Sequence, residues 1–291
     1  MTAVARTGPR SRLVLRTRGT TLSIVVGTLV ALVAWEIAAR ALAASTPQGD
    51  RVLPSLLTVA TDGFLGLGHY YSGGLGVSAE SAGGDGSALA SVLALVSNAL
   101  VTMSRVAMGL GLAIVVGLVV GVLVAAVRPV RLSVSGVAEL MRMLPALAMA
   151  PLFTLWFGAT TLASVVFIVF SGAFVVLIAT VNAIANLPPH VTDYPRTLGV
   201  SGARLYGRVV LPAILPELRG SLVFTGLVAW TTVLASEMYG LQSGLGWMLN
   251  DTLRFSLIDR MVVVAVVFSA LALVTMKLLG SGVSRLTLWN A

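Results

Sequence analysis

Cysteine is absent from this chain of 291 residues, and histidine occurs only twice, as His69 and His190. The chain therefore has no disulfide, thiol nucleophile or thiolate metal site, and two distant histidines give little support to a metal or catalytic cluster. Also missing are a G-x-x-x-x-G-K-[ST] loop for nucleotide phosphates and a G-x-S-x-G nucleophile turn. These absences argue against an enzyme, and we expect no catalytic residue, no metal site and no cofactor bound by this chain.

Charged residues are scarce as well. They make up 10% of the chain, whereas a soluble domain has about 25%. Hydrophobic residues account for 57%, and the mean hydropathy is +0.97, which is typical of a membrane protein. The formal net charge of +8 would suggest a nucleic-acid partner in a soluble protein. In a membrane protein basic residues set the orientation instead, so we expect contact with lipid and no nucleic acid.

Five apolar regions are long enough to cross a bilayer, which takes roughly 20 apolar residues. They cover residues 20–42, 106–127, 143–192, 218–239 and 261–280. The third region has 50 residues without Asp, Glu, Lys or Arg, too many for one span, and the turn at Gly158 divides it. The sequence therefore predicts an all-α polytopic membrane protein with about six transmembrane helices.

The distribution of basic residues predicts the orientation. With a cytoplasmic N-terminus, 14 of the 19 Lys and Arg residues fall on the inner side, as expected for cytoplasmic loops. Both termini are then cytoplasmic. A cleaved signal peptide is the alternative interpretation of the first apolar run, but that run is long for such a segment and its cleavage site is weak, so we favour an uncleaved span.

These spans divide the chain into five segments. We expect a basic arm at 1–19, a first transmembrane helix at 20–44, an external loop at 45–92, a transmembrane core at 93–284 and a cytoplasmic tail at 285–291. Residues 63–86 hold nine glycines among 24 residues, which predicts an irregular or mobile loop. From Ala88 the chain turns apolar again, which indicates an external or interfacial helix that leads into the second span.

The most informative stretch is a polar interruption at 193–212, DYPRTLGVSGARLYGRVVLP. Its backbone and charges would be unsatisfied in lipid, so it has to lie in water on one side of the membrane. Gly199 allows a bend between two short helices. Asp193 is able to cap the first helix, and a proline such as Pro195 is tolerated only in a first turn. A second helix over 201–210 would present Arg204 and Arg208 on one face, with Leu205 and Val209 on an adjoining face.

The spacing of this stretch resembles the cytoplasmic coupling loop of bacterial ABC importer permeases. That loop reads Glu-Ala-Ala, three residues, Gly, nine residues, Ile-x-Leu-Pro, and this chain has DYP at 193–195, Gly199 and VVLP at 209–212. The sequence departs from the family where Asp-Tyr-Pro replaces Glu-Ala-Ala. The resemblance implies a coupling loop over 187–213 that is moved by an ATPase subunit. The implied loop residues are Asp193, Arg196, Gly199, Arg204, Leu205, Arg208, Val209, Leu211 and Pro212.

Other motifs are similar to the nitrate, sulfonate and taurine permeases within that family. They are RMLPALAMAPLFTLWFG at 142–158, SGLG at 243–246, LPS at 53–55 and Arg105 followed by Gly109, so the resemblance covers most of residues 50–285. It implies the type I importer permease fold in a bacterial cell membrane. It also implies a permease homodimer, two ATPase subunits that hold ATP and Mg²⁺, and an external substrate-binding protein. The implied function is a translocation path for a small polar or anionic solute.

Four residues are candidates for the translocation path or a gate: Pro145, Pro151, Trp156 and Glu237. The two prolines flank a short or broken third span, whose freed carbonyls would be available to line a cavity. The carboxylate of Glu237 in an apolar helix must face a pore, a partner or a hydrogen bond, so a gate and a structural role both stay open. Tryptophan at position 156 is more often a packing residue than a pore residue.

Two other functions stay open. An ion-gradient-driven secondary transporter would suit six spans and an embedded Glu237, and a non-transporting membrane scaffold would need no path. The match at 193–212 favours the ABC permease over both.

Overall fold

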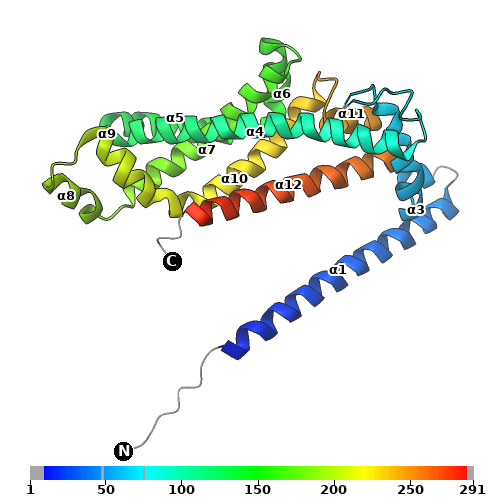
Figure 1. Ribbon diagram of the computed structural model, residues 1–291, viewed down its shortest axis with the longest axis horizontal. Helices are drawn as coiled ribbons and strands as arrows, with labels where there is room; N and C mark the ends of the chain where they lie inside the picture. The colour runs from blue at the N-terminus through cyan, green and yellow to red at the C-terminus, as the bar shows by residue number, and fades with distance from the viewer. Residues whose placement is uncertain (1–9, 47–48, 75, 287–291) are drawn as a thin grey trace, which may run out of the picture.

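The structure is a computed structural model that describes residues 10–46, 49–74 and 76–286, and it is built of helices (Figure 1). Within these residues, five helices are long and apolar enough to cross a membrane. They are α1 (Arg10–Ser45), α4 (Ala88–Ala126), α7 (Thr161–Ala185), α10 (Leu211–Met238) and α12 (Ile258–Leu286). A sixth span is formed if α5 (Arg128–Met143) and α6 (Ala146–Phe157) count together, although they meet at 95°. The predicted all-α architecture of about six spans is confirmed.

Small residues let α4 and α7 pack closely along much of their length. A Cβ atom at Gly109 would lie 2.6 Å from Cβ of Ile168, and one at Gly117 would lie 2.5 Å from Cβ of Val176. Gly121 similarly faces Thr180. These glycines share one helix face because they repeat at multiples of four residues, the spacing that brings membrane helices together.

The bundle has two distinct ends (Figure 1). One end carries the short α8 (Pro189–Thr197), α9 (Gly202–Leu205) and the π-helical turn η3 (Tyr206–Val210). The opposite end carries α2 (Gly49–Val52), α3 (Leu56–Thr58), η1 (Val59–Gly63), η2 (Gly66–Tyr70) and α11 (Leu245–Arg254). Each end has its own buried cluster, one around Ile214 and Leu218 and the other around Leu67 and Met248.

The glycine-rich segment is irregular, as expected, but it is anchored to the bundle. Leu67, Tyr70 and Tyr71 are buried in one cluster with Ala94 of α4 and Met248 of α11. The hydroxyl of Tyr71 also donates to the carbonyls of Gly74 and Val77, which closes the turn. The apolar area of these three residues holds the segment in place despite its glycines.

The following helix and the second span form one continuous helix, α4, of 39 residues. At 1.5 Å per residue it is about 58 Å long, almost twice the thickness of the hydrocarbon layer. No proline or glycine turn interrupts it between Ala88 and Ala126, which explains its continuity.

Helix α1 leaves the bundle near α2 and α3 and runs away from the other spans (Figure 1). The ion pair of Glu36 with Arg40, at 2.8 Å, confirms the helical pairing that their spacing predicts. Glu36 also accepts the N–H of Leu56, and Trp35 donates to the carbonyl of Pro54, so this end of α1 is tied to the following turn. Of the predicted arm and tail, residues 1–9 and 287–291 lie outside the described residues.

Candidate functional site

The predicted loop at 187–213 consists of a short helix, a glycine turn and a second helix. Helix α8 ends where the N–H of Gly199 donates to Arg196 and the N–H of Val200 donates to Pro195, both at 3.0 Å. This pair of bonds needs a left-handed residue after the helix, and Gly199 has φ of +81°. A Cβ at Gly199 would meet nothing within 4 Å, so the backbone conformation alone accounts for glycine here.

The start of this loop differs from the sequence expectation. Helix α8 begins at Pro189, so Asp193 lies in its middle and does not cap it. The carboxylate of Asp193 instead lies 3.7 Å from the guanidinium of Arg196, with both side chains exposed. Pro195 stands inside α8 near its C-terminal end, beyond the first turn. The expected cap and first-turn proline are therefore wrong, because Pro188 and Pro189 begin the helix earlier.

The second helix of the loop runs directly into α10. Residues from Gly202 to Met238 form one helical stretch through α9, η3 and α10. Leu205 is buried in this chain against Ile214, so it faces the bundle and not a partner. Val209 and Leu211 are half-buried, and Pro212 lies in the first turn of α10. A displacement of the loop would therefore reach α10 through a continuous helical backbone that includes the π-helical turn η3 and Pro216.

The outer surface of the loop is basic and partly apolar. Its exposed side chains include Arg196, Arg204 and Arg208, together with Tyr194 and Leu198, which are more than half exposed. Exposed tyrosine and arginine side chains are enriched at protein interfaces, so this surface has a composition that favours binding of a partner.

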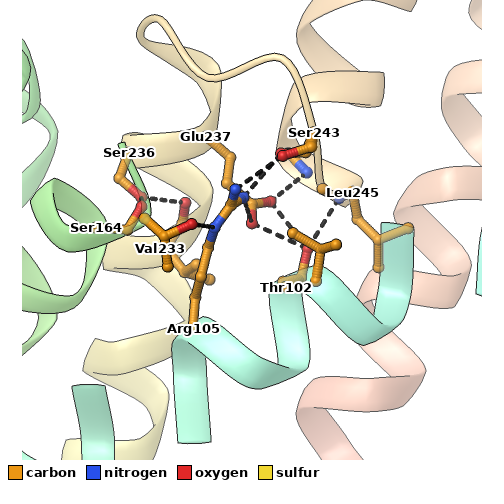
Figure 2. A network of polar contacts seen from close by, with 12 residues as sticks. Thr102, Arg105, Ser164, Val233, Ser236, Glu237, Ser243 and Leu245 are labelled. Carbon is orange, nitrogen blue, oxygen red and sulfur yellow. Dashed lines mark hydrogen bonds and ion pairs between the residues drawn. The ribbon is translucent and has the colours of Figure 1, made fainter. Parts of the chain in front are cut away.

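At the far end of α10, Glu237 is completely buried and forms an ion pair with Arg105 of α4 (Figure 2). The guanidinium Nη1 lies 2.8 Å from Oε1 of Glu237 and 2.8 Å from the carbonyl oxygen of Ser243, to which it also donates. Nη2 donates to the hydroxyl of Ser243. The arginine is therefore bound by two separate elements.

The carboxylate of Glu237 has further donors. The hydroxyl of Thr102 lies 3.0 Å from both carboxylate oxygens, and the N–H of Gly246 donates to Oε2 at 2.8 Å. Thr102 in turn accepts the N–H of Leu245 (Figure 2). A buried ion pair is tolerated when hydrogen bonds satisfy its remaining donors and acceptors in this way.

Two glycines allow the loop after α10 to wrap around Glu237. A Cβ at Gly244 would lie 2.4 Å from the carboxyl group, and one at Gly246 would lie 2.7 Å from Cβ of Glu237. The N–H of Gly244 donates to Asn98 of α4 at 2.8 Å. The motif at 243–246 therefore ties α4, α10 and α11 together.

The sequence pointed to Glu237 but missed its partner. Arg105 is the only charged residue of α4, and Glu237 is the only one between Arg219 and Asp251. A single basic residue and a single acidic residue in two apolar helices indicate that the two side chains could form an ion pair. The proximity itself depends on the packing of α4 against α10, which the sequence alone did not give.

The other three path candidates lie at the break between α5 and α6. Pro145 is the extended residue that precedes α6, and Pro151 stands within α6. Trp156 is 62% exposed near the end of α6, where it contacts Phe153. These three residues lie on one element, whereas Glu237 belongs to the buried pair with Arg105.

A polar cavity of about 780 Å³ opens at the end of the bundle that carries α11. Its walls include Asn98, Gln242, Trp247 and the pair of Tyr70 with Asp251, whose oxygen atoms lie 2.9 Å apart. Burial, and then the hydrogen bond to Asp251, raise the pKa of the Tyr70 phenol, so it remains a donor at neutral pH. In the described part of the chain, no group of three or more His, Asp or Glu side chains could hold a metal ion.

A family model supports the resemblance seen in the sequence. Residues 113–286, more than half of the chain, match the model described as "Binding-protein-dependent transport system inner membrane component". A protein of Methanocaldococcus jannaschii named as an ABC transporter permease is 31% identical over 62% of this chain and 68% of its own length. An aliphatic sulfonates transport permease protein of Bacillus subtilis is 27% identical over 60% of this chain and 63% of its own length.

The fold is also known from a solved structure. The permease fold in inward-facing conformations of the MetNI methionine ABC transporter matches with a TM-score of 0.54 and 22% identity. The match covers 66% of this chain and 94% of that chain, and it supports the fold alone.

Proposed function

We propose the translocation path and the partners of this chain from the family to which it belongs. That family is the binding-protein-dependent transport system inner membrane component, and within it the chain is an ABC importer permease of the sulfonate, taurine and nitrate branch. Two copies of the chain line a path for a small anionic solute of the sulfonate kind. Two separate ATPase subunits bind the loops at 187–213. An external binding protein delivers the solute at the end that carries α11.

The observation that carries this proposal is the continuity of the loop with α10. The helical stretch from Gly202 to Met238 has 37 residues and changes direction between α9 and α10 (Figure 1), and α10 itself, with 28 residues or about 42 Å, is long enough to cross the membrane. Its loop end exposes an interface surface, and its other end is fixed to α4 by Glu237 and Arg105. ATP binding would close the ATPases, move the loops and tilt α10 as a rigid body, which switches the path from inward- to outward-facing.

The orientation follows from the charges. Arg196, Arg204 and Arg208 all lie at the loop end, which the positive-inside rule assigns to the cytoplasm. Helix α12 ends at the same end of the bundle (Figure 1), which supports a cytoplasmic C-terminus. The opposite end, with α11 and the glycine-rich segment, is then external.

The burial of Glu237 argues against a secondary transporter. The residue that suited it, an embedded Glu237, is completely buried in an ion pair and does not line the described cavities. A proton- or ion-coupled carboxylate needs access to water, which this one lacks.

Substitution of Gly199 tests the coupling role. Gly199→Val forces a β-branched residue into a left-handed backbone, at a cost of roughly 1–2 kcal/mol, and should distort the end of α8. In the assembled transporter we expect ATP hydrolysis to continue while solute uptake falls roughly tenfold or more. Gly220→Val is the control, because Gly220 lies in α10 with open space around it and no positive φ. Normal uptake by Gly199→Val would refute the coupling role.

A further inference from the structure

A second cavity lies at the break between α5 and α6. It has a volume of about 350 Å³ and is lined by α5, α6, α7 and α10. Six of its thirteen lining residues are methionine or phenylalanine, including Met149, Phe170 and Phe224. Three polar side chains also line it: Arg142, Ser171 and Thr231.

The cavity lies at the level of the membrane interior. Ser171 is close to the midpoint of α7 (Thr161–Ala185), and Phe224 is close to the midpoint of α10 (Leu211–Met238). Both helices run along the bundle, and α6 turns away from α5 at this level (Figure 1). A break in a span at membrane depth is tolerated where it lines a cavity or is covered by protein.

Arg142 is the one charged residue among those that line this cavity. None of the ion pairs found among the described residues includes Arg142. An arginine at this depth is costly unless it faces water or an opposite charge. Arg142 is exposed in the described chain and also lines this cavity, so its guanidinium is accessible to an anion that enters from water.

The first turn of α6 adds positive potential at the same place. Ala146, its first residue, lines the cavity, and no side chain caps the helix. The first N–H groups of a helix have no partner within it and favour an anion. Arg142 and this helix end thus act on one cavity from the two sides of the break.

We propose that this cavity is an anion-selecting site in the translocation path, where Arg142 binds the charged head of the solute. The inference rests on the proposed function, because it places the site in the path of that importer. The volume is at the lower end of the range for ligand sites and suits a small organic sulfonate or carboxylate. Its methionine and phenylalanine wall would hold an aliphatic tail.

The absence of cysteine makes a direct test simple, since one introduced thiol is the only one in the chain. Ser171→Cys places a thiol in the cavity and keeps Arg142. The nucleotide-free transporter in membrane vesicles is treated with anionic sulfonatoethyl methanethiosulfonate or with its cationic trimethylammonioethyl counterpart. The rate of each reaction is read from the mass of the purified chain.

We expect the anionic reagent to react faster, and the ratio of the two rates to fall about tenfold when Arg142→Gln is added. Arg128→Gln should leave the ratio unchanged, because Arg128 lies at the other end of α5, is exposed like Arg142 and does not line the cavity. Thr231→Cys repeats the measurement from α10, in case the first variant fails to fold. The proposal would be overturned if the thiol is unreactive at both positions. It would also be overturned if Arg142→Gln leaves the ratio of the two labelling rates unchanged.

The two proposals fail separately. Labelling depends on water and charge in the cavity and needs no ATP. If the anion preference holds but the chain never couples to an ATPase, the proposed function is wrong and the site remains. If uptake is ATP-driven but Arg142→Gln does not change the ratio of the labelling rates, the proposed importer function stands and the proposed anion site is wrong.

Discussion

Glu237 and Arg105 are the residues where burial and charge conflict most strongly. Both side chains are at most 3% exposed, and together they bind three elements through the loop at 243–246. Removing one partner leaves the other charged and buried, which costs about 3–5 kcal/mol in comparable pairs. The pair therefore holds the end of α10 near α11 in place, and its loss should be visible as instability.

We predict that Glu237→Gln lowers the thermal stability of the purified transporter and that adding Arg105→Gln restores part of the loss. The amide group leaves the guanidinium without an anion and places a donor where Gly246 and Thr102 also donate. Detergent melting curves for both variants give the measurement. Glu139→Gln, on an exposed face of α5, is the control. Unchanged melting for Glu237→Gln would show that the pair does not hold these elements together.

Residue types predicted some of these sites and missed others. The spacing around Gly199 predicted a bend, because a glycine between two helical patterns has few other uses. The predicted helix cap at Asp193 and first-turn position of Pro195 were wrong, because the pair of prolines at 188–189 starts α8 earlier than the motif suggested. Arg105 was missed as a partner because a contact across 132 residues depends on helix packing.

At the scale of elements, the most extensive helix–helix interface of the bundle is that of α4 with α7. Gly109, Gly117 and Gly121 lie where a side chain would collide with α7. In lipid, helices associate through such close packing because the lipid tails are as apolar as the helix surfaces.

We predict that Gly117→Leu separates α4 from α7 and lowers stability by roughly 1–3 kcal/mol, the usual cost of overpacking. A Cβ at Gly117 already lies 2.5 Å from Val176, so the larger side chain cannot fit. Gly111→Leu lies on the same helix with nothing within 4 Å and should be neutral. Equal melting temperatures for the two variants would show that close packing at Gly117 does not hold α4 against α7.

The helices whose bounds follow from hydropathy were predicted well. The angles between helices, which depend on packing, were not predicted. Long apolar runs gave α7, α10 and α12 directly. The run at 143–157 was predicted to form a short or broken third span, and α6 has only 12 residues and meets α5 at 95°. Pro145 and Pro151 marked that break, although proline alone gives no angle.

For the whole molecule we propose one fixed end and one movable end, joined by the helical stretch that contains α10. Glu237 ties the end of α10 near α11 to α4, whereas the loop at 187–213 continues α10 at the other end. Composition and span count were sufficient to predict the class of the fold. The arrangement of the spans, and the cavity at the α5–α6 break, arise from contacts between distant segments and could not be read from the sequence.

The central claim is that ATP hydrolysis on a separate subunit drives import through this chain. The direct measurement is uptake of radiolabelled ethanesulfonate into proteoliposomes that contain the chain, its ATPase subunits and enclosed ATP, with the binding protein outside. We predict uptake that requires ATP and is unaffected by an uncoupler. Uptake that persists without ATP and collapses with the uncoupler would contradict the claim.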